Sequence, residues 1–238
     1  MGGEDLHGTE GARCPAGPST VAGGGDSIWK EELMTVITAI YGSPRRKGNT
    51  ALLLREAVRG AREAGAEVDE VVLRDLKMSP CLEIYGCTKT GRCAIQDEFQ
   101  GVYDRIEASQ GIMLASPVFF YAVSAHTKIL MDRCQSLWVK RYQLEGQELD
   151  PAAGKGAREY RRKGLFISVG ATRGKKLFEG SLLTVRYFFD AIGTERWKSL
   201  LYRGIDQEGE VLGHPEYLQE ACEAGRSLVR AIESKPVC

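Results

Sequence analysis

Short apolar segments alternate with amphipathic segments along most of this chain. The apolar segments are rich in β-branched residues and occupy residues 35–41, 68–73, 111–115, 164–169 and 199–203. Between several of them, apolar residues recur at the spacing of helices that bury one face. This alternation is typical of a parallel sheet covered by helices on both faces. The pattern therefore predicts an α/β fold with five strands in one sheet.

Four helices are predicted from this spacing and from residues that start or stop helices. The first covers residues 50–64, with Asn49 or Thr50 as its N-cap and Gly65 at its end. A second is capped by Ser124, and a third covers residues 177–192. The last begins at Pro215. The apolar residues predicted to face the core are Leu54, Val58 and Ala61 in the first helix, Ile129, Leu130, Leu137 and Trp138 in the second, and Leu218, Cys222, Leu228 and Ile232 in the last.

The first 33 residues lack this pattern. They are rich in Gly, Ser, Pro and Ala and contain the run Gly23-Gly24-Gly25. We expect residues 1–33 to form a disordered tail. Residues 34–238 are then one domain, and the folded protein is expected to begin at Met34, directly before the first strand.

Composition excludes several classes of protein. The chain has 32 basic and 32 acidic residues, so no overall charge attracts nucleic acid or an anionic membrane. No apolar segment is long enough to span a bilayer, and the start does not resemble a signal peptide. Seven cysteines, an odd number, argue for a reducing compartment, and only three histidines argue against histidine chemistry. We expect a cytoplasmic protein that binds neither nucleic acid nor membrane.

The turn between the first strand and the first helix has the composition of an anion site. Its sequence is GSPRRKGNT, residues 42–50, and it lies at the carboxyl end of a strand. A helix N-terminus there offers free N–H groups, and Ser43, Asn49 and Thr50 add neutral donors. The Gly-Lys-Ser/Thr ending of a triphosphate loop and the GxGxxG dinucleotide pattern are both absent. A terminal monophosphate fits better, although a basic surface turn would have the same composition.

A second motif follows the third strand. It reads SPVFFYAVSAHTK over residues 116–128 and is followed by Asp132 and Arg133. In a doubly wound sheet this aromatic loop leaves the sheet beside the first turn, at the switch point where flavin mononucleotide (FMN) binds in such folds. Phe119 and Phe120 alone would be assigned to a core, but their place beside an anion loop favours a cofactor wall.

Together these motifs resemble the NADPH-dependent FMN reductase and iron-sulfur flavoprotein family of the flavodoxin-like superfamily. The likeness covers nearly all of residues 34–234, including CTKTGRC at 87–93 and GATRGKKLF at 170–178. It implies a flavodoxin-like doubly wound sheet with strand order 2-1-3-4-5, and FMN bound to residues 34–238. It also implies homodimers or homotetramers, in which Trp138 and Tyr142 are candidates for the subunit interface. Alternatively, these two residues are ordinary core or surface aromatics.

The resemblance implies contacts to FMN residue by residue. The phosphate would be held by one turn, the ring would lie against the aromatic loop, and the loop after the fourth strand would close the other side. The predicted FMN-binding residues are Ser43, Pro44, Arg45, Gly48, Asn49 and Thr50 in the first group, Pro117, Val118, Phe119 and Phe120 in the second, and Gly170, Thr172 and Arg173 in the third.

The iron-sulfur members of this family carry four closely spaced cysteines, and this chain departs from that pattern. Cys81, Cys87 and Cys93 occupy three of the four places, but Ile84 occupies the second. A four-iron cluster normally takes four thiolates, so Cys134 would have to supply the fourth ligand. Three thiolates with a water molecule would alternatively bind zinc. The remaining interpretation is a loop whose cysteines serve only packing.

The function that follows from the resemblance is a flavoprotein oxidoreductase. NAD(P)H would reduce the flavin, which would pass electrons to a small molecule or a protein, with no catalytic side chain required. The alternatives are an electron carrier that exchanges electrons with ferredoxin, and a flavin redox sensor without turnover. One further segment has two interpretations. Residues 143–163 end in a basic cluster of Arg158, Arg161, Arg162 and Lys163, which is either part of a solvated loop or a contact to nucleotide phosphates.

Overall fold

The structure is a computed structural model, and it describes residues 34–146 and 160–234. The predicted disordered tail, residues 1–33, lies outside the described residues, as does most of the polar stretch between 143 and 163. The described residues belong to one compact unit, which begins at Met34.

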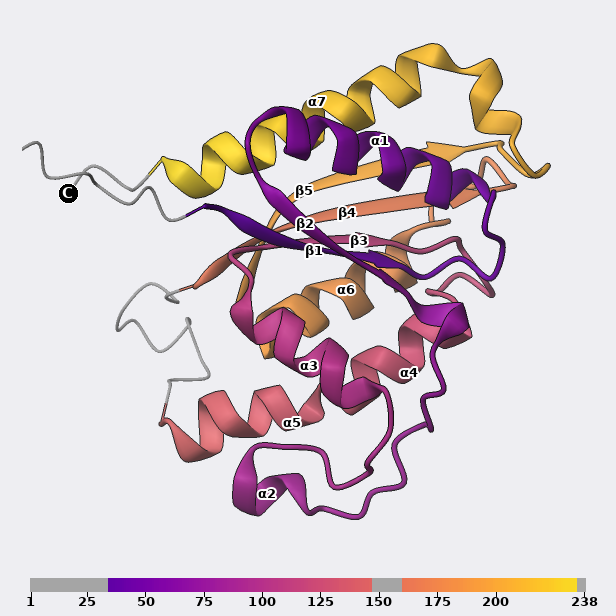
Figure 1. The fold of residues 1–238 in the computed structure, drawn as a ribbon. Coiled ribbons are helices and arrows are strands. Elements are labelled where there is room, and N and C mark those ends of the chain that lie inside the picture. The colour runs from indigo at the N-terminus through magenta and orange to yellow at the C-terminus, as the bar shows by residue number, and fades with distance from the viewer. Residues whose placement is uncertain (1–33, 147–159, 235–238) are drawn as a thin grey trace, which may run out of the picture. The chain divides into compact units, whose positions relative to one another are not determined.

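Five parallel strands form one sheet in the order β2-β1-β3-β4-β5 (Figure 1). This confirms the predicted fold class and strand order. The fifth strand begins five residues before the predicted segment. Its first half was missed because it is polar and largely accessible, with exposed Arg196 and Lys198 alternating with partly buried Glu195 and Trp197. The strands are β1 Val36–Tyr41, β2 Glu67–Val72, β3 Gly111–Ala115, β4 Arg162–Gly170 and β5 Thr194–Arg203.

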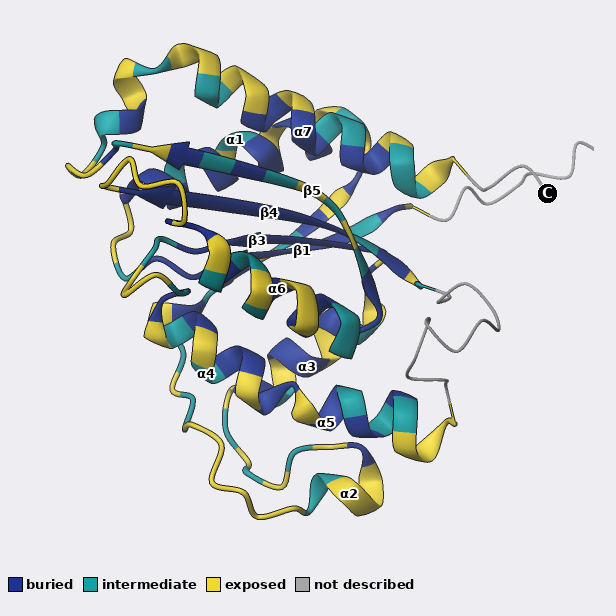
Figure 2. Ribbon diagram, turned by 180° about the vertical axis from the view of Figure 1, so that it is seen from behind, coloured by how far each residue is buried: buried dark blue, intermediate teal, exposed yellow. Residues whose placement is uncertain are grey.

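Helices cover both faces of the sheet. In Figures 1 and 2, α1 and α7 lie on one face and α3, α4, α5 and α6 on the other. No helix in the described ranges is both long and apolar enough to cross a membrane. The α-helices are α1 Asn49–Glu63, α2 Cys87–Thr90, α3 Phe99–Ala108, α4 Ala125–Arg133, α5 Gln135–Trp138, α6 Glu179–Ala191 and α7 Pro215–Glu233.

The sheet carries a separate apolar core on each face, and its central strands are buried throughout (Figure 2). Between α1 and α7 the backbones meet closely: a Cβ on Gly60 would lie 1.9 Å from the carbonyl oxygen of Cys222. A Cβ on Gly225 would lie equally close to the carbonyl oxygen of Ala57. Glycine is therefore required at this helix crossing. Cys222 is 2% exposed, which confirms its predicted core position.

Several local predictions are confirmed and others are wrong. Ser124 accepts a hydrogen bond from the Thr127 N–H and so caps α4. The helix beyond it is not continuous, because α4 ends at Arg133 and a π-helix follows α5 over Val139–Leu144. The predicted cap of α1 is wrong, since the N-cap is Gly48 without any side-chain bond.

Helix α3 was not predicted, although its sequence contains the signal. Its buried residues are Phe99, Val102, Tyr103 and Ile106, which have helical spacing. Gly101 and the neighbouring cysteine-rich loop obscure this pattern. The loop contains α2, a single turn without buried residues.

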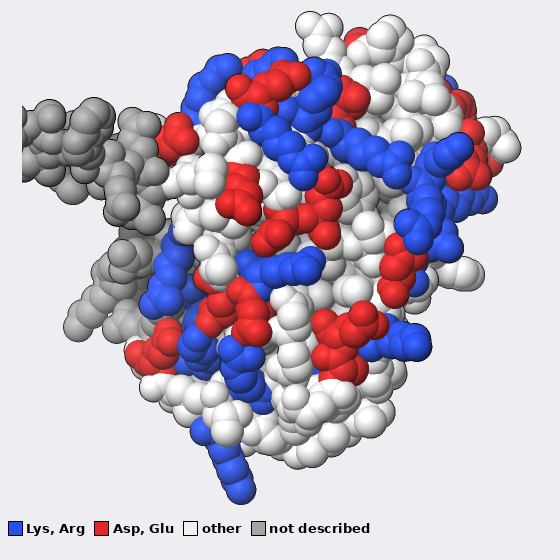
Figure 3. Space-filling view, viewed as in Figure 1, with Lys and Arg blue, Asp and Glu red and all other residues white. Residues whose placement is uncertain are grey.

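The face drawn in Figure 3 carries interspersed basic and acidic side chains. Many basic side chains of the described residues pair with acidic ones, for example Arg59 with Glu56 and Arg62 with Glu70. No broad surface of one charge covers this face, in keeping with the balanced composition.

Candidate functional site

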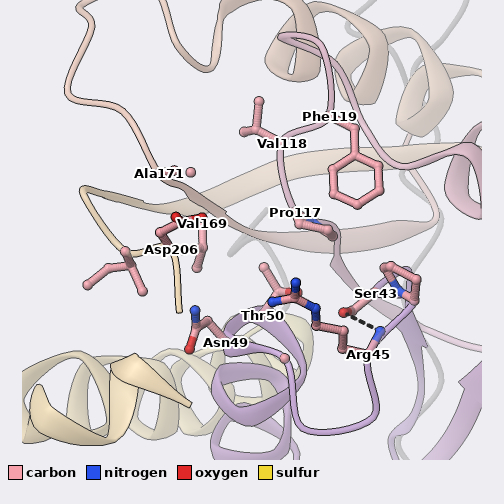
Figure 4. A pocket seen from close by; sticks show the side chains of 14 residues that line it. Ser43, Arg45, Asn49, Thr50, Pro117, Val118, Phe119, Val169, Ala171 and Asp206 are labelled. Atoms are coloured by element: carbon pink, nitrogen blue, oxygen red, sulfur yellow. Dashed lines mark hydrogen bonds between the residues drawn. The ribbon is translucent and has the colours of Figure 1, made fainter. Parts of the chain in front are cut away.

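A pocket of about 170 Å³ lies at the carboxyl ends of the central strands. Three segments form it: the turn between β1 and α1, the loop after β3, and the ends of β4 and β5 (Figure 4). All but three of the residues predicted to bind FMN line it. The lining residues are Ser43, Pro44, Arg45, Gly48, Asn49, Thr50, Pro117, Val118, Phe119, Val169, Gly170, Ala171, Ile205 and Asp206.

The turn from Ser43 to Gly48 is built around its own hydrogen bonds. Ser43 Oγ accepts a bond of 3.1 Å from the Arg45 N–H, and the Gly48 N–H donates to the Arg45 carbonyl at 3.2 Å. A Cβ on Gly48 would lie 2.7 Å from Ser43 Oγ, so a larger residue would push the serine aside. The turn therefore keeps the serine hydroxyl at the pocket, where its proton is free to be donated.

The beginning of α1 supplies further donors. The backbone N–H groups of Asn49 and Thr50 have no hydrogen-bond partner within the described residues, as is usual for a first helical turn. Thr50 is 2% exposed, and its hydroxyl also lacks a recorded partner. Figure 4 shows the Arg45 side chain pointing toward the pocket beside Thr50. These groups together favour an anion.

The side chain of Asn49 is used differently from the prediction. Its Nδ2 donates to the Gln207 carbonyl at 2.8 Å, and its Oδ1 accepts from the Val211 N–H at 3.2 Å. Asn49 therefore ties α1 to the turn after β5. Only its backbone N–H is left entirely for a ligand.

The aromatic loop after β3 presents mainly side-chain surface to the pocket. The Val118 N–H donates to the Val169 carbonyl at 3.0 Å, and the Phe119 N–H donates to the Ala122 carbonyl at 2.9 Å. Pro117 has no N–H. Bonds within the protein therefore occupy the backbone donors of Val118 and Phe119, and these donors are not available to a ligand.

Phe120 and Tyr121 form a tight turn with left-handed backbone at φ 48° and 60°. The reciprocal bonds between Phe119 and Ala122 close this turn. Phe120 is fully exposed and does not line the enclosed pocket. Two adjacent aromatic residues in this conformation are strained, and such strain is concentrated at functional sites.

The third wall comes from the ends of β4 and β5. Gly170 lines the pocket as predicted, but Thr172 and Arg173 do not. The Arg173 guanidinium lies against Gly204, whose Cβ, if present, would be 2.9 Å from it. Arg173 thus packs against Gly204, two residues before Asp206, and does not line the pocket.

Four lining residues were not predicted: Val169, Ala171, Ile205 and Asp206. Ile205 and Asp206 follow the end of β5, and ligands of open α/β sheets bind at such strand ends. The predicted fifth strand ends at residue 203, as β5 does in the structure. The residues directly after it could therefore have been predicted from the sequence to line the pocket. Asp206 places a carboxylate opposite the donor groups of α1.

The pocket suits the phosphate of FMN and the adjoining part of the cofactor. One side of the pocket has the free N–H groups of Asn49 and Thr50, the close backbone at Gly48 and the cation of Arg45. The other side has apolar surface from Pro117, Val118 and Phe119. The enclosed volume is below the roughly 300 Å³ of a typical ligand pocket, so a ligand of this size would extend onto the rim.

A second cavity, of about 620 Å³, lies at the cysteine-rich loop. Cys81, Cys87 and Cys93 line it together with Arg133 and Asp132. Burial is the main cause that raises the pKa of Cys87. The structure therefore brings the three predicted cysteines to one cavity.

The donor set at this cavity does not fit a four-thiolate cluster. Ile84 is 58% exposed and supplies no ligand, and Cys134 is completely buried in the core. Burial strongly raises the pKa of Cys134, which favours the neutral thiol. Within residues 34–146 and 160–234, no group of three or more His, Cys, Asp or Glu side chains is arranged to hold a metal ion.

The basic residues at the start of β4 do not line the pocket at its other end. Arg162 is buried at the opposite end of β4, where its guanidinium donates to the carbonyls of Ser109, Ile192 and Glu107. Arg161 lies 3.7 Å from Glu145. Arg161 and Arg162 lie at the amino end of β4, whereas the pocket lies at its carboxyl end, so the interpretation of these two residues as phosphate contacts is wrong. Arg158 lies outside the described residues.

Comparison with known proteins points to one family. A family model described as NADPH-dependent FMN reductase matches residues 35–186. An iron-sulfur flavoprotein from Methanocaldococcus jannaschii is 41% identical over 101 residues, 42% of this chain and 52% of that protein. A second one from the same organism is 30% identical over 156 residues, 64% of this chain and 70% of the relative. The matched segment spans about half the length of the first curated relatives.

Solved structures support the fold. A flavone reductase is similar with a TM-score of 0.61 at 20% identity, covering 84% of this chain and 64% of that one. At this identity the similarity shows the fold alone.

Proposed function

Because this chain belongs to the NADPH-dependent FMN reductase family, we propose that it binds FMN and passes electrons from NAD(P)H to a second acceptor. The observation that carries the proposal is the juxtaposition of an anion-binding helix start with the aromatic loop after β3. In this arrangement Ser43, Arg45 and the first turn of α1 bind a phosphate. Pro117, Val118 and Phe119 offer an apolar wall beside it.

In this reaction the protein positions the cofactor and provides the charges and dipoles around it. Bound FMN would supply the hydride acceptor, so no acid or base side chain is needed. The residues of the Ser43–Thr50 turn hold the phosphate end, and the apolar wall excludes water from one side. Phe120, Thr172 and Arg173 remain proposed contacts to the part of the cofactor beyond the enclosed pocket.

The proposal is tested by the visible spectrum of protein purified without oxygen. Flavin absorbance near ~450 nm that bleaches with NADPH or NADH is expected. Titration of flavin-free protein with FMN and with riboflavin adds a sharper test, since riboflavin lacks the phosphate. Colourless protein that takes up neither compound would contradict the proposal.

The second candidate is an electron carrier that exchanges electrons with a ferredoxin-like protein. The name iron-sulfur flavoprotein, given to the relatives above, favours it. Rapid reduction by ferredoxin without NADPH or NADH oxidation would select this function over the reductase. Inactivity with all three donors, despite bound FMN, would indicate a redox sensor.

We also propose a homodimer or homotetramer in the cytoplasm. The five cysteines of the described ranges are free thiols, which supports a reducing compartment. Trp138 and Tyr142 lie together on one side of the molecule, with ring centroids 5.7 Å apart, and remain interface candidates. Light scattering of the wild type and of Trp138→Ala tests the assembly.

A further inference from the structure

The cysteine-rich loop, residues 77–98, is held by one buried arginine. The side chain of Arg133 is 0% exposed. Its Nη1 donates to the Ser79 carbonyl and to Asp97, each at 2.8 Å. Its Nη2 donates to the Ile95 carbonyl at 3.1 Å and to Asp97 at 3.0 Å. These four bonds join the beginning of the loop to its end.

The fifth donor of Arg133 contacts a cysteine. Nε donates to Cys93 Sγ at 3.0 Å, so all five N–H groups of the guanidinium have partners in the loop. The guanidinium also stacks over the Phe99 ring, 4.6 Å from its centroid. A bidentate arginine–carboxylate pair with every donor satisfied is the strong form of a buried ion pair.

Arg133 is itself fixed by a rigid element. It is the last residue of α4, whose first turn is capped by Ser124. The Ser124 hydroxyl donates to the Gly42 carbonyl at 2.6 Å, at the end of β1. The loop is thus anchored to the sheet through one helix. This anchor requires no ligand from the cysteines.

The cysteines are correspondingly available. Cys81 is exposed, and Cys87 and Cys93 are partly exposed on the same cavity. A four-thiolate cluster would need a fourth sulfur there, and Cys134 points into the core instead.

We propose that this loop is ordered by the Arg133–Asp97 pair in place of an iron-sulfur cluster, and that Cys81, Cys87 and Cys93 are free thiols open to soft electrophiles. The three sulfurs line one accessible cavity, so each meets a small thiol-reactive compound. Cys134 and Cys222 are the internal controls, because both are buried. This inference does not depend on FMN binding.

The first experiment measures iron, sulfide and thiol accessibility on the full chain purified without oxygen. Native protein is treated with N-ethylmaleimide, and each cysteine is assigned by peptide mass spectrometry. We expect substoichiometric iron and sulfide, modification of Cys81, Cys87 and Cys93, and modification of Cys134 and Cys222 only after unfolding. About four irons and four sulfides per chain, with the loop cysteines protected, would overturn the proposal.

The second experiment separates the two ways of ordering the loop. Hydrogen exchange of residues 77–98 is compared between Arg133→Met and the triple variant with serine at positions 81, 87 and 93. We expect Arg133→Met to speed exchange about tenfold or more and the triple variant to leave it near the wild-type rate. The reverse order would refute the proposal.

Two further variants keep this test decisive. Asp97→Asn retains the arginine and serves if Arg133→Met does not fold; it is expected to speed exchange in the same segment. Lys128→Met is the matched control, because Lys128 lies on the same helix and pairs with exposed Asp132. FMN titration of each variant, measured separately, shows whether the first pocket is intact.

Discussion

Asn49 and Gln207 are joined by a hydrogen bond of 2.8 Å across 158 residues of sequence. The same side chain accepts a bond from the N–H of Val211, a fully buried residue. Two walls of the first pocket, the start of α1 and the turn that carries Asp206, are therefore held at a fixed separation. One amide side chain sets the width of the proposed binding site.

Replacing Asn49 with alanine should lower both stability and FMN affinity. The buried Val211 N–H would lose its partner, which costs about 1–3 kcal/mol in the free energy of unfolding. Urea denaturation of the flavin-free protein measures this cost. Lys47→Ala is the control, since Lys47 is exposed in the adjoining turn. Equal stability of the two variants would show that the tie contributes nothing.

Arg45 should distinguish FMN from riboflavin. Its guanidinium has no recorded partner in the described ranges, whereas the neighbouring Arg46 pairs with Asp75 at 2.8 Å. We expect Arg45→Ala to weaken FMN binding by roughly 1.5–3 kcal/mol, the value of a hydrogen bond to a charged group, and to leave riboflavin binding unchanged. Arg46→Ala should affect neither. Flavin fluorescence quenching measures all four affinities, and a loss shared equally by both flavins would refute a phosphate contact.

Gly48 should be intolerant of a methyl group. A Cβ there would lie 2.7 Å from Ser43 Oγ and 3.2 Å from the Arg45 Cβ. Gly48→Ala is expected to reduce FMN affinity about tenfold or more, because it displaces the serine from the pocket. Gly101→Ala is a suitable comparison: its Cβ would meet nothing within 4 Å. That helical position should gain about 0.5–1 kcal/mol in stability.

Acid should weaken the Arg133–Asp97 pair. Burial opposes ionisation of Asp97, but the hydrogen bonds from Arg133, Ser79 and Phe99 outweigh it and hold its pKa below the ordinary 3.8. A lowered folded-state pKa gives stability that is complete above about pH 4 and is lost as pH falls through the folded value. The difference in unfolding free energy between wild type and Asp97→Asn should therefore shrink between pH 6 and pH 3. A constant difference would contradict this assignment.

The sequence predicted features that depend on local chemistry. Ser124 was identified as a cap because an N-cap needs only its own side chain and the next turn. The third strand was located at residues 111–115, where a short buried run is bounded by polar residues. The turn at residues 42–50, which is proposed to bind an anion, was placed between β1 and α1 by the same kind of pattern. In each case the deciding contacts lie within a few residues.

Features that depend on distant contacts were missed or misassigned. Asn49 was a candidate cap, but its amide bonds to Gln207 and Val211 instead. Arg133 was noted beside the aromatic motif without any sign that it would be buried, since arginine is rarely buried unless it is paired. Asp206 lines the pocket only because the turn after β5 is brought to α1. None of these arrangements has a signature within one segment.

The last prediction concerns the strain at Phe120 and Tyr121. Both central residues of this turn have positive φ, a geometry for which Asn-Gly is the preferred pair. The double substitution Phe120→Asn with Tyr121→Gly should therefore raise the free energy of unfolding by about 1 kcal/mol.

The same substitution should slow electron transfer to the acceptor if the exposed rings belong to the proposed site. NADPH oxidation and urea denaturation are measured on one preparation, with Tyr187→Ala as the control for loss of an exposed aromatic ring elsewhere. Greater stability with lower turnover would show that the aromatic turn is kept for function against its backbone cost. Greater stability with unchanged turnover would remove Phe120 from the site and confine the proposed contacts of this loop to Pro117, Val118 and Phe119.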